Sequence, residues 1–269
     1  MTPPPRLVAT DLDGTIVGAD RRTSGRTRRA LAAVLAADAA VVLASGRTPR
    51  KMRGLAALTG VDGVAIGANG AVLYDLRTDR IIDLRLMDPP TLREVAARLA
   101  ATLPAVAFGV EYGEAFGHEP HYRHARSRPD RSCRVASYAQ LTDRPAVKLV
   151  AQLPGPGADR QVAQARAAVG DLASVAHSSA TALEVAPAGV TKASALAELC
   201  ARWTIDARDV VAFGDMPNDI PMLAWAGLGV AVGNADPAVR AVADRVTGSV
   251  AEDGVATILE ELFPVCSTD

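Results

Sequence analysis

The amino-acid sequence predicts an α/β protein, in which a doubly wound parallel sheet forms a core and a smaller α+β domain is inserted into it. Three short apolar runs, each bounded by polar residues or glycine, have the pattern of strands that are buried on both faces of a parallel sheet. These runs are Leu7 to Thr10, Ala40 to Ala44 and Val210 to Phe213. Helical segments separate them, so the first and last thirds of the chain are typical of β-α units.

The helices of the core are predicted from Ala and Leu at helix-like spacing. They are expected at Thr27 to Ala37, Arg50 to Leu58, Val190 to Trp203 and Asn218 to Ala226. The run Gly227 to Gly233 is similar to a dinucleotide-binding turn, but its last glycine falls one place late. We therefore expect a packed strand there.

The middle of the chain has a different pattern, and residues 84–186 are predicted to form the inserted domain. The core then comprises residues 1–83 and 187–269. A hairpin-like pair, Ala71 to Tyr74 and Ile81 to Leu84, precedes the insert. Inside it we expect helices at Thr91 to Ala101 and Asp159 to Val169, strands at Val106 to Glu111, Val147 to Gln152, Ser174 to His177 and Ala182 to Val185, and a polar loop rich in His and Arg that extends to Arg134.

Composition and charge exclude several classes of protein. The 29 Lys and Arg nearly balance the 30 Asp and Glu, so the whole chain has no attraction to nucleic acid or to an anionic membrane. Aromatic residues make up only 4% of the chain, which argues against a base-stacking surface. The three cysteines are scattered, the first residues lack a secretory signal, and no apolar stretch reaches the roughly 20 residues of a membrane span. We expect a cytoplasmic protein without a membrane segment.

Polar residues follow all three apolar runs, at the point where each predicted strand ends. The first run is followed by Asp11, Leu12, Asp13, Gly14 and Thr15, the second by Ser45, Gly46 and Arg47, and the third by Gly214, Asp215, Met216, Pro217, Asn218 and Asp219. The carboxyl ends of parallel strands meet at one edge of a sheet, where ligands bind. We therefore expect these side chains to share one crevice.

Four carboxylates in one crevice would repel each other unless a cation relieved the repulsion. These are Asp11, Asp13, Asp215 and Asp219, and Mg²⁺ is the expected cation because neither Cys nor His lies near them. Lys192, at the start of a predicted helix, is the expected positive partner of a nucleophilic carboxylate and of phosphate. The segment after the second strand offers a hydroxyl and an accessible backbone amide for phosphate oxygens.

In this order, the three segments and Lys192 resemble the four motifs of haloacid dehalogenase (HAD) superfamily phosphatases, and more narrowly those of the Cof-type branch. Asn69 to Ala71, Gly233 to Ala235 and Glu252 to Val255 look like that branch as well, and the size and place of the insert resemble its type IIB cap. Two positions depart from the usual pattern: Ala193 stands where glycine is frequent, and Val250 where asparagine is frequent. The second departure removes a side chain that would make a peripheral polar contact to the metal site.

The resemblance implies a Rossmann-like HAD core, a cap that closes over the site, and Mg²⁺-dependent hydrolysis of small phosphorylated metabolites through an aspartyl-phosphate. Asp11 is the implied nucleophile, and Asp13 the implied acid and base. Mg²⁺ would be held by Asp11, the backbone carbonyl of Asp13 and Asp215, while Asp219 orients Lys192 or a metal-bound water. The side chains and backbone implied to bind the phosphate are Thr15, Ser45, Gly46, Arg47, Lys192 and Asn218.

Two other functions stay open. A phosphotransferase or phosphomutase would use the same intermediate but pass the phosphoryl group to a sugar hydroxyl. A receiver-like binding protein would use the acidic cluster and Lys192 for signalling, although the large insert and Asp13 argue against it. The oligomeric state is not predicted.

The leaving group is not specified by these motifs. Three histidines and five arginines make a basic stretch in the insert: His118, His121, Arg123, His124, Arg126, Arg128, Arg131 and Arg134. A solvated loop is the simpler interpretation. The sharper one is that part of this stretch, with Glu111, Glu119 and Tyr122, faces the site. Zinc binding by the histidines is disfavoured, because their spacing lacks the usual i, i+4 helical pair.

Overall fold

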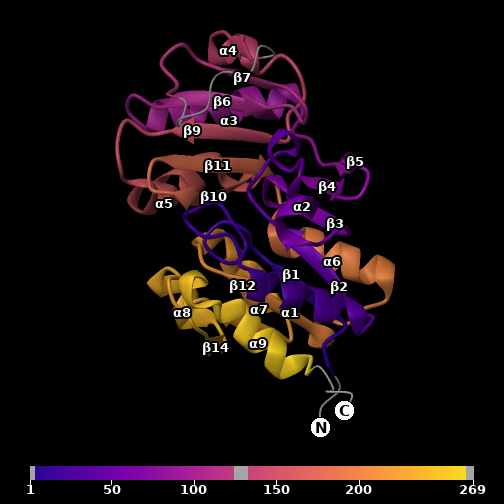
Figure 1. Ribbon diagram of the computed structural model, residues 1–269. Helices are drawn as coiled ribbons and strands as arrows, with labels where there is room; N and C mark the ends of the chain where they lie inside the picture. Colours follow the sequence, from indigo (N-terminus) through magenta and orange to yellow (C-terminus); the bar gives the residue numbers. More distant parts are fainter. Residues whose placement is uncertain (1–3, 124–132, 265–269) are drawn as a thin grey trace, which may run out of the picture.

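The computed structural model describes residues 4–123 and 133–264, and its strands form two sheets. Figure 1 shows the sheets as two lobes, with the first and last thirds of the chain below and the middle third above. We call the lower sheet the core sheet and the upper one the cap sheet. Each has its own apolar core.

The core sheet has the strand order β14-β13-β12-β1-β2-β3-β4-β5. Its strands are β1 (Leu7–Thr10), β2 (Ala40–Ala44), β3 (Val64–Gly67), β4 (Val72–Asp75), β5 (Arg80–Leu84), β12 (Val210–Gly214), β13 (Leu228–Ala231) and β14 (Arg245–Val246). The strands from β14 to β3 are parallel, and β4 and β5 add an antiparallel edge. The chain moves from β1 to β2 in one direction and from β12 to β13 in the other. Such a reversal opens a crevice at the carboxyl ends of the strands.

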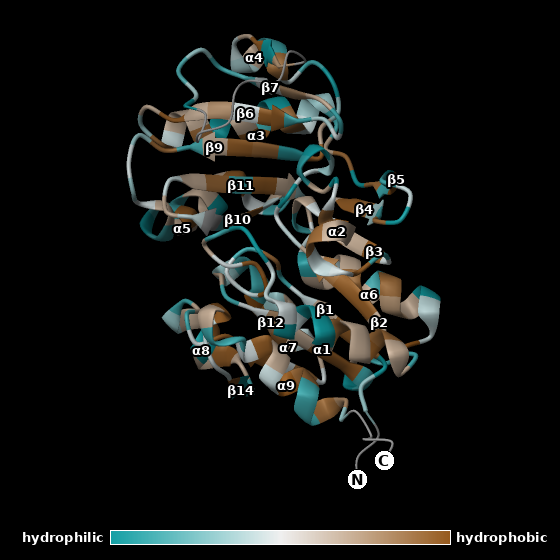
Figure 2. Ribbon diagram, in the orientation of Figure 1, coloured by the Kyte–Doolittle hydropathy of each residue, from teal (hydrophilic) through white to brown (hydrophobic). Residues whose placement is uncertain are grey.

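Helices cover both faces of the core sheet, because right-handed crossovers that lead in opposite directions place their helices on opposite faces. α1 (Gly25–Ala36) packs with α9 (Gly254–Leu262), and α6 (Lys192–Trp203) packs with α7 (Ile220–Trp225). Two shorter helices are α2 (Leu55–Thr59) and α8 (Pro237–Val242). In Figure 2 strand β2 is brown and the outer side of α1 is teal, as expected for a sheet that is covered on both faces.

The cap sheet has the strand order β10-β11-β9-β6-β7-β8. Its strands are β6 (Ala107–Glu111), β7 (Phe116–His118), β8 (Arg134–Val135), β9 (Lys148–Gln152), β10 (Ala173–Ser179) and β11 (Ala182–Pro187). Its helices are α3 (Pro89–Thr102), α4 (Tyr138–Leu141) and α5 (Ala158–Val169), of which α3 and α5 pack together.

Alternation along the cap strands gives this sheet one apolar face and one polar face. In β9, Leu149 and Ala151 belong to the apolar core of the cap, whereas Lys148, Val150 and Gln152 line a cavity on the side of the core sheet. Successive side chains of a strand point to opposite faces, so a period of two produces this division. The cap therefore turns its more polar face toward the carboxyl ends of the core strands.

The predicted fold class is confirmed, and the strands predicted from the first two apolar runs have the predicted bounds. The helix predicted at Arg50 to Leu58 is wrong. A 3₁₀ turn (Pro49–Lys51) and α2 replace it, and Gly54, with a φ of 78°, separates them. The helix predicted from Asn218 is a 3₁₀ turn (Pro217–Asp219) followed by α7.

The cap departs from the predicted pattern in its polar loop. β7 and β8 lie within the segment that was predicted to be one loop. The extent of the cap domain, residues 84–186, stays a proposal. Within the described ranges, every helix is too short or too polar to cross a bilayer.

Candidate active site

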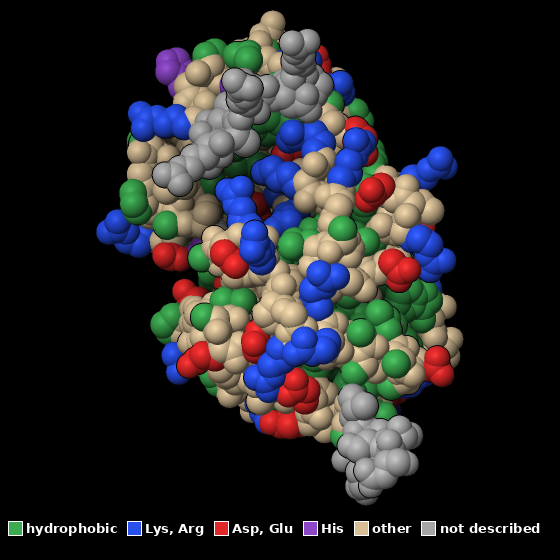
Figure 3. Space-filling model, in the orientation of Figure 1, with side chains coloured by type: hydrophobic (Ala, Val, Ile, Leu, Met, Phe, Trp, Pro, Cys, Tyr) green, Lys and Arg blue, Asp and Glu red, His purple; other side chains and the backbone are tan. Residues whose placement is uncertain are grey.

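The polar residues that follow β1, β2 and β12 meet at the carboxyl end of the core sheet, beneath the cap sheet. They border a cavity of about 560 Å³ that is also lined by residues of the cap. In Figure 3, Lys and Arg side chains gather around the hollow between the two lobes. The predicted site residues that line this cavity are Asp11, Asp13, Ser45, Gly46, Arg47 and Asn218.

Lys192 links two of the predicted carboxylates. It is the first residue of α6, and only 1% of its surface is exposed. Its ammonium donates to Asp11 Oδ1 at 2.5 Å and to Asp219 Oδ1 at 2.6 Å. Burial alone would lower the pKa of Lys192, but the charges of Asp11 and Asp219 outweigh burial and raise this pKa above its ordinary value. The lysine is therefore charged at neutral pH.

Three buried carboxylates form a group that could hold a metal ion. Asp11, Asp215 and Asp219 each offer an oxygen, and these atoms lie within 4.8 Å of one another. Burial raises the pKa of Asp11 well above its ordinary value, and burial and the charge of Asp219 raise the pKa of Asp215 to about 6. One buried lysine does not balance three carboxylates, and a divalent cation would. Donors that are all oxygen fit Mg²⁺, so the site fits the predicted ion.

Asp219 is the most constrained member of this group. Its Oδ2 accepts hydrogen bonds from the backbone N–H groups of Asp215 and Met216 at 3.1 and 3.0 Å, while its Oδ1 accepts from Lys192. Both oxygens are thus engaged by the protein. Of the two roles expected for Asp219, these bonds support the orientation of Lys192.

The turn after β1 places Thr15 beside Asp215. The buried hydroxyl of Thr15 donates to Asp215 Oδ1 at 3.1 Å, and neither residue lines the cavity, so a contact of Thr15 with phosphate stays a prediction. The chain folds back at Gly14, which has a φ of 95° and lies so close to Asp215 that a Cβ would be 2.2 Å from Oδ2. Asn234 ties this turn to the backbone of Val250, because it donates to the Gly14 carbonyl and accepts from the Val250 N–H, each at 2.8 Å.

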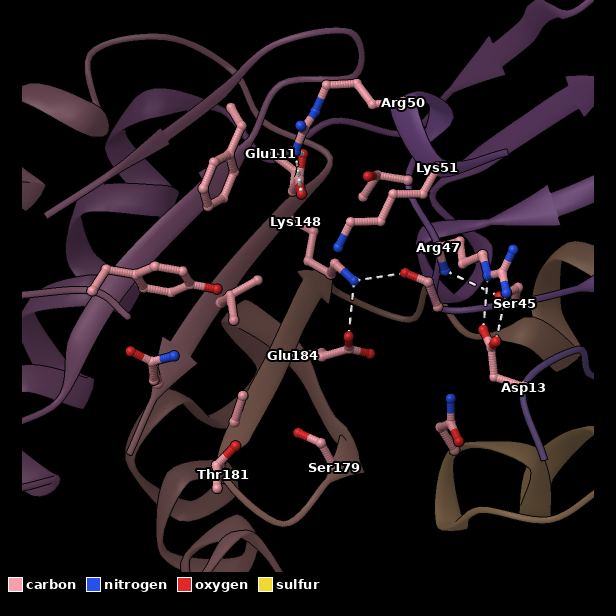
Figure 4. A pocket seen from close by; sticks show the side chains of 18 of the residues that line it. Asp13, Ser45, Arg47, Arg50, Lys51, Glu111, Lys148, Ser179, Thr181 and Glu184 are labelled. Carbon is pink, nitrogen blue, oxygen red and sulfur yellow. Dashed lines mark hydrogen bonds and ion pairs between the residues drawn. The ribbon is translucent and has the colours of Figure 1, made fainter. Parts of the chain in front are cut away.

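Asp13 and Arg47 form a direct ion pair. Arg47 Nε donates to Asp13 Oδ2 at 2.8 Å and Nη2 donates to Oδ1 at 2.5 Å. Two parallel bonds of this kind fix the relative orientation of both groups. Figure 4 shows this pair. The Asp13 side chain is 58% exposed and is not a member of the buried carboxylate group, so it lies at the rim of the site. A contribution of its backbone carbonyl to the metal stays a prediction.

The loop after β2 and the turn before α7 face each other across the site. Ser45 Oγ accepts a hydrogen bond from the Arg47 N–H at 3.1 Å, and the Gly46 carbonyl accepts one from Lys148 Nζ at 2.7 Å. Asn218 Nδ2 donates to Asn69 Oδ1 at 3.0 Å. Asn218 Oδ1 is buried and has no hydrogen-bond partner among the described residues.

The cap places some of its predicted residues at the cavity and others elsewhere. Glu111 and Tyr122 line the cavity, and Glu111 accepts two bonds of 2.9 Å from Arg50 Nη2. Glu119 instead accepts from the Phe108 N–H at 2.8 Å, which holds the cap backbone. His118 is buried in β7. Of the other residues of the basic stretch, Arg123 lines the cavity, Arg134 pairs with Asp143 and His121 is exposed. His124, Arg126, Arg128 and Arg131 lie outside the described residues.

Several polar residues of the site were not predicted, among them Arg50, Asn69, Lys148 and Glu184. Asn69 belongs to a motif of the resemblance, but no role was assigned to it. Lys148 and Glu184 each interrupt an otherwise apolar predicted strand. A charged residue in such a strand is rarely buried without a partner, and this signal would have drawn attention to both.

The family model for haloacid dehalogenase-like hydrolases matches residues 8–259. The chain belongs to this family. One curated relative is a phosphoglycolate phosphatase of Methanopyrus kandleri, 32% identical over 96% of this chain and 97% of its own. Another is a 5-amino-6-(5-phospho-D-ribitylamino)uracil phosphatase of Bacillus subtilis, 29% identical over 93% of each chain.

Solved structures of HAD proteins share the whole fold. A sugar phosphatase of HAD subclass IIB aligns with a TM-score of 0.80 at 20% identity, over 95% of this chain and 98% of its own. A haloacid dehalogenase-like hydrolase from B. subtilis aligns with a TM-score of 0.81 at 23% identity, over 96% and 99%. The predictions of a Cof-type HAD protein and of a phosphatase are confirmed.

Proposed function

We propose that this HAD phosphatase is a Mg²⁺-dependent phosphomonoester hydrolase that acts on small phosphorylated metabolites through an aspartyl-phosphate at Asp11. The observation that carries the proposal is the position of Asp11. It lies at the end of β1, lines the cavity, is held by Lys192 and belongs to the buried carboxylate group. A carboxylate nucleophile that lies beside Lys192 and beside a site for Mg²⁺ suits attack on an electrophilic phosphorus.

In the first half of the reaction, Lys192 holds Oδ1 of Asp11, so Oδ2 is the oxygen that attacks phosphorus. The new Asp11 Oδ2–P bond forms as the bond to the leaving oxygen breaks, and Asp13 gives that oxygen a proton. Mg²⁺, when bound by Asp11, Asp215 and the backbone carbonyl of Asp13, would neutralise charge on the phosphoryl oxygens.

In the second half, a water molecule attacks the phosphorus of the aspartyl-phosphate. Asp13 takes a proton from this water, Asp11 leaves as a free carboxylate, and inorganic phosphate is released. Ser45, Gly46, Arg47 and Asn218 border the space for the phosphoryl oxygens. The cap sheet above them would exclude bulk water while the intermediate exists.

The substitution Asp11→Asn tests the proposal. Without a nucleophilic carboxylate, Mg²⁺-dependent phosphate release from p-nitrophenyl phosphate should fall at least about 1000-fold. Asp62→Asn makes the same change at an exposed carboxylate and should leave the rate unaltered. Substantial remaining activity in Asp11→Asn would refute the assignment of the nucleophile.

The same assay separates hydrolysis from its alternatives. Release of phosphate in the absence of a sugar acceptor supports a hydrolase, while dependence on an acceptor supports a phosphotransferase. A long-lived phosphoenzyme would favour the receiver-like protein. The panel of substrates should include phosphoglycolate and 5-amino-6-(5-phospho-D-ribitylamino)uracil, the compounds that name the two relatives above.

A further inference from the structure

A chain of polar side chains connects the cap sheet with the candidate active site. Lys148 on β9 donates to Glu184 Oε1 on β11 at 2.9 Å (Figure 4). Glu184 Oε2 accepts from Asn69 Nδ2 at 2.5 Å. Asn69 Oδ1 in turn accepts from Asn218 Nδ2 at 3.0 Å. We call Lys148, Glu184, Asn69 and Asn218 the cap relay.

The side chains of the cap relay are largely buried, although Lys148, Glu184 and Asn218 also line the cavity. The side chains of Lys148 and Glu184 are 5% and 14% exposed, and Asn69 and Asn218 are buried. Burial alone would raise the pKa of Glu184, but the charge of Lys148 and the hydrogen bonds from Lys148 and Asn69 outweigh it and lower this pKa. Glu184 is therefore an ionised carboxylate, which can only accept hydrogen bonds.

This property of Glu184 fixes the orientation of two amides. Asn69 must turn its NH₂ toward the carboxylate, so its carbonyl oxygen faces Asn218. Asn218 must then turn its NH₂ toward Asn69. Asn218 lines the cavity, and its own Oδ1 is left as a buried acceptor that has no partner in the described part of the chain.

The backbone supports this arrangement at two positions of the core, Asn69 and Gly46. Asn69 has a φ of 57° and a ψ of 29°, a conformation that asparagine tolerates better than most residues. A Cβ on residue 46 would lie 3.2 Å from both Asn69 Oδ1 and Glu184 Oε2, so glycine makes room for the contact. The Gly46 carbonyl also accepts from Lys148, which ties the cap ion pair to the loop after β2.

We propose that Lys148 and Glu184 are positioning residues that act through Asn69 to present the Asn218 carbonyl oxygen, as a hydrogen-bond acceptor, to the reacting groups. This inference rests on the proposed function. The acceptor suits a donor near phosphorus, such as the water that attacks the aspartyl-phosphate. The predicted role of Asn218, a contact to an unprotonated phosphate oxygen, would instead have required a donor.

The relay also couples the cap to the site. Lys148 and Glu184 come from the cap sheet, whereas Gly46, Asn69 and Asn218 come from the core. The bonds of Lys148 to Gly46 and of Asn69 to Glu184 exist only while the cap sheet lies against the core. Asn218 is thus held in its reactive orientation when the cavity is covered.

The substitution Glu184→Gln tests the relay. Lys148 would donate to the amide oxygen of Gln, so the amide NH₂ would face Asn69. Asn69 would then turn its NH₂ toward Asn218, which would turn over in its place and direct its own NH₂, not its carbonyl oxygen, at the reacting groups. We expect kcat to fall about 10- to 100-fold, and equally for p-nitrophenyl phosphate and for a sugar phosphate, because Asn218 acts near phosphorus and not on the leaving group. Asp143→Asn, which removes the same charge from the exposed cap pair with Arg134, is the matched control and should keep the wild-type kcat.

Asn69→Gly provides a second test that does not depend on the folding of Glu184→Gln. Glycine accepts the φ of residue 69 without strain, but it breaks the relay. It should lower kcat to the same extent, and the double variant should lose no more than either single one, because both act through Asn218. Losses that multiply, an unchanged kcat, or a change confined to the KM of one substrate would overturn the relay.

A readout without catalysis separates the relay from the proposed function. In the ¹⁵N–¹H NMR spectrum of the substrate-free protein, the side-chain amide resonances of Asn218, assigned by their loss in Asn218→Asp, should move in Glu184→Gln and stay in place in Asp143→Asn. If the wild type releases no phosphate, the proposed function fails, and this shift still decides the relay. Unmoved resonances would contradict it.

Discussion

Lys192 and its carboxylate partners show how strongly the charges of single residues depend on one another in this site. A buried ammonium is unfavourable unless it is paired, and Lys192 is paired with both Asp11 and Asp219. Asp215 has no such lysine contact among the described residues. Its carboxylate receives the Thr15 hydroxyl instead, and its pKa is raised to about 6. The charge of Asp215 therefore changes near pH 6.

We predict that the stabilisation of the protein by Mg²⁺ grows between pH 5 and pH 7.5. Because the pKa of Asp215 is raised to about 6 in the folded protein, its carboxyl is largely protonated at pH 5 and is a poor ligand there. Without metal, ionising Asp215 destabilises the folded state as the pH rises from about 4 to about 6, and bound Mg²⁺ offsets this loss. Melting temperatures with and without Mg²⁺ at both pH values measure the effect, and an equal shift at both would contradict the prediction.

Glycine is required at position 14 for two reasons: the backbone conformation and the close approach of Asp215. Its φ of 95° is unfavourable for a residue with a Cβ, and that Cβ would collide with the Asp215 carboxylate. Gly54 also has a left-handed φ, 78°, but nothing lies within 4 Å of its Cβ position. Substitutions of these two glycines therefore distinguish the effect of backbone strain from the effect of a steric clash with Asp215.

We predict that Gly14→Ala removes most activity, whereas Gly54→Ala leaves it intact. Both should lower the free energy of unfolding by about 1 to 2 kcal/mol, the strain of a left-handed alanine. Only Gly14→Ala displaces Asp215, and it should also weaken Mg²⁺ binding, measured by calorimetry. Equal activity in the two variants would mean that the turn after β1 does not position Asp215.

At the scale of secondary structure, the first turn of α6 determines where Lys192 lies. Thr191 caps this helix: its hydroxyl accepts from the Ser194 N–H at 3.0 Å, and Ser194 Oγ accepts from the Thr191 N–H at 2.9 Å. Gly70 packs against the same turn, and a Cβ there would lie 2.2 Å from the Thr191 carbonyl oxygen. The start of α6 therefore packs closely against the turn that carries Asn69.

We predict that Thr191→Ala lowers stability by about 1 kcal/mol, as expected for the loss of a cap, and lowers kcat about 3- to 10-fold because Lys192 loses its fixed position. Ser24→Ala is the control. Ser24 caps α1, a helix of the same 12-residue length as α6, and accepts from the Thr27 N–H at 3.0 Å. It should lose as much stability with no loss of kcat. Chemical denaturation and steady-state kinetics measure both quantities.

The sequence predicted elements well where one local rule decided the structure. β1 and β2 are short apolar runs that are buried on both faces, and their bounds agree with the prediction. The helix predicted at Arg50 to Leu58 failed because its spacing was helical while Gly54 interrupts it. β7 was missed because its three residues pair with β6 and form no pattern of their own.

At the scale of the whole molecule, ion pairs cross from the core to the cap. Arg50 of the core holds Glu111 of β6 at the cavity, and this carboxylate is buried. Arg53 holds Glu114 of the β6–β7 connection at 3.0 Å, with side chains 64% and 51% exposed. A buried pair depends on both partners, whereas an exposed pair contributes little.

We predict that Glu111→Gln changes the relative kcat/KM values across a panel of phosphorylated metabolites by about 10-fold, because it frees the half-buried guanidinium of Arg50 at the cavity. Glu114→Gln, the same change in the exposed pair, should keep the relative values within about 2-fold. A phosphate-release assay on both variants and the wild type is the measurement. Parallel profiles for all three would remove Glu111 from substrate selection.

The candidate site was predictable only in part, because some of its contacts join the cap to the core. Asp11, Ser45, Asp215 and Lys192 follow strand ends or begin a helix, and the topology of a parallel sheet brings such positions together. Glu184 and Asn69 are 115 residues apart, and their contact depends on how the cap sits over the core. The course of Thr15 toward Asp215 likewise depends on the turn at Gly14, which spacing alone does not reveal.

The return of the chain from the cap restricts how caps can be exchanged between relatives. β11 carries Glu184 and ends at Pro187, and α6 begins with Lys192, so one short segment serves both lobes. A cap graft that ends inside this segment would join β11 of one parent to Lys192 of the other, and both Glu184 and Lys192 could then change position. Chimeras that take residues 182–192 from one parent should therefore retain turnover better than chimeras whose junction lies between these residues. In libraries of recombined caps, the junction is best placed before β11.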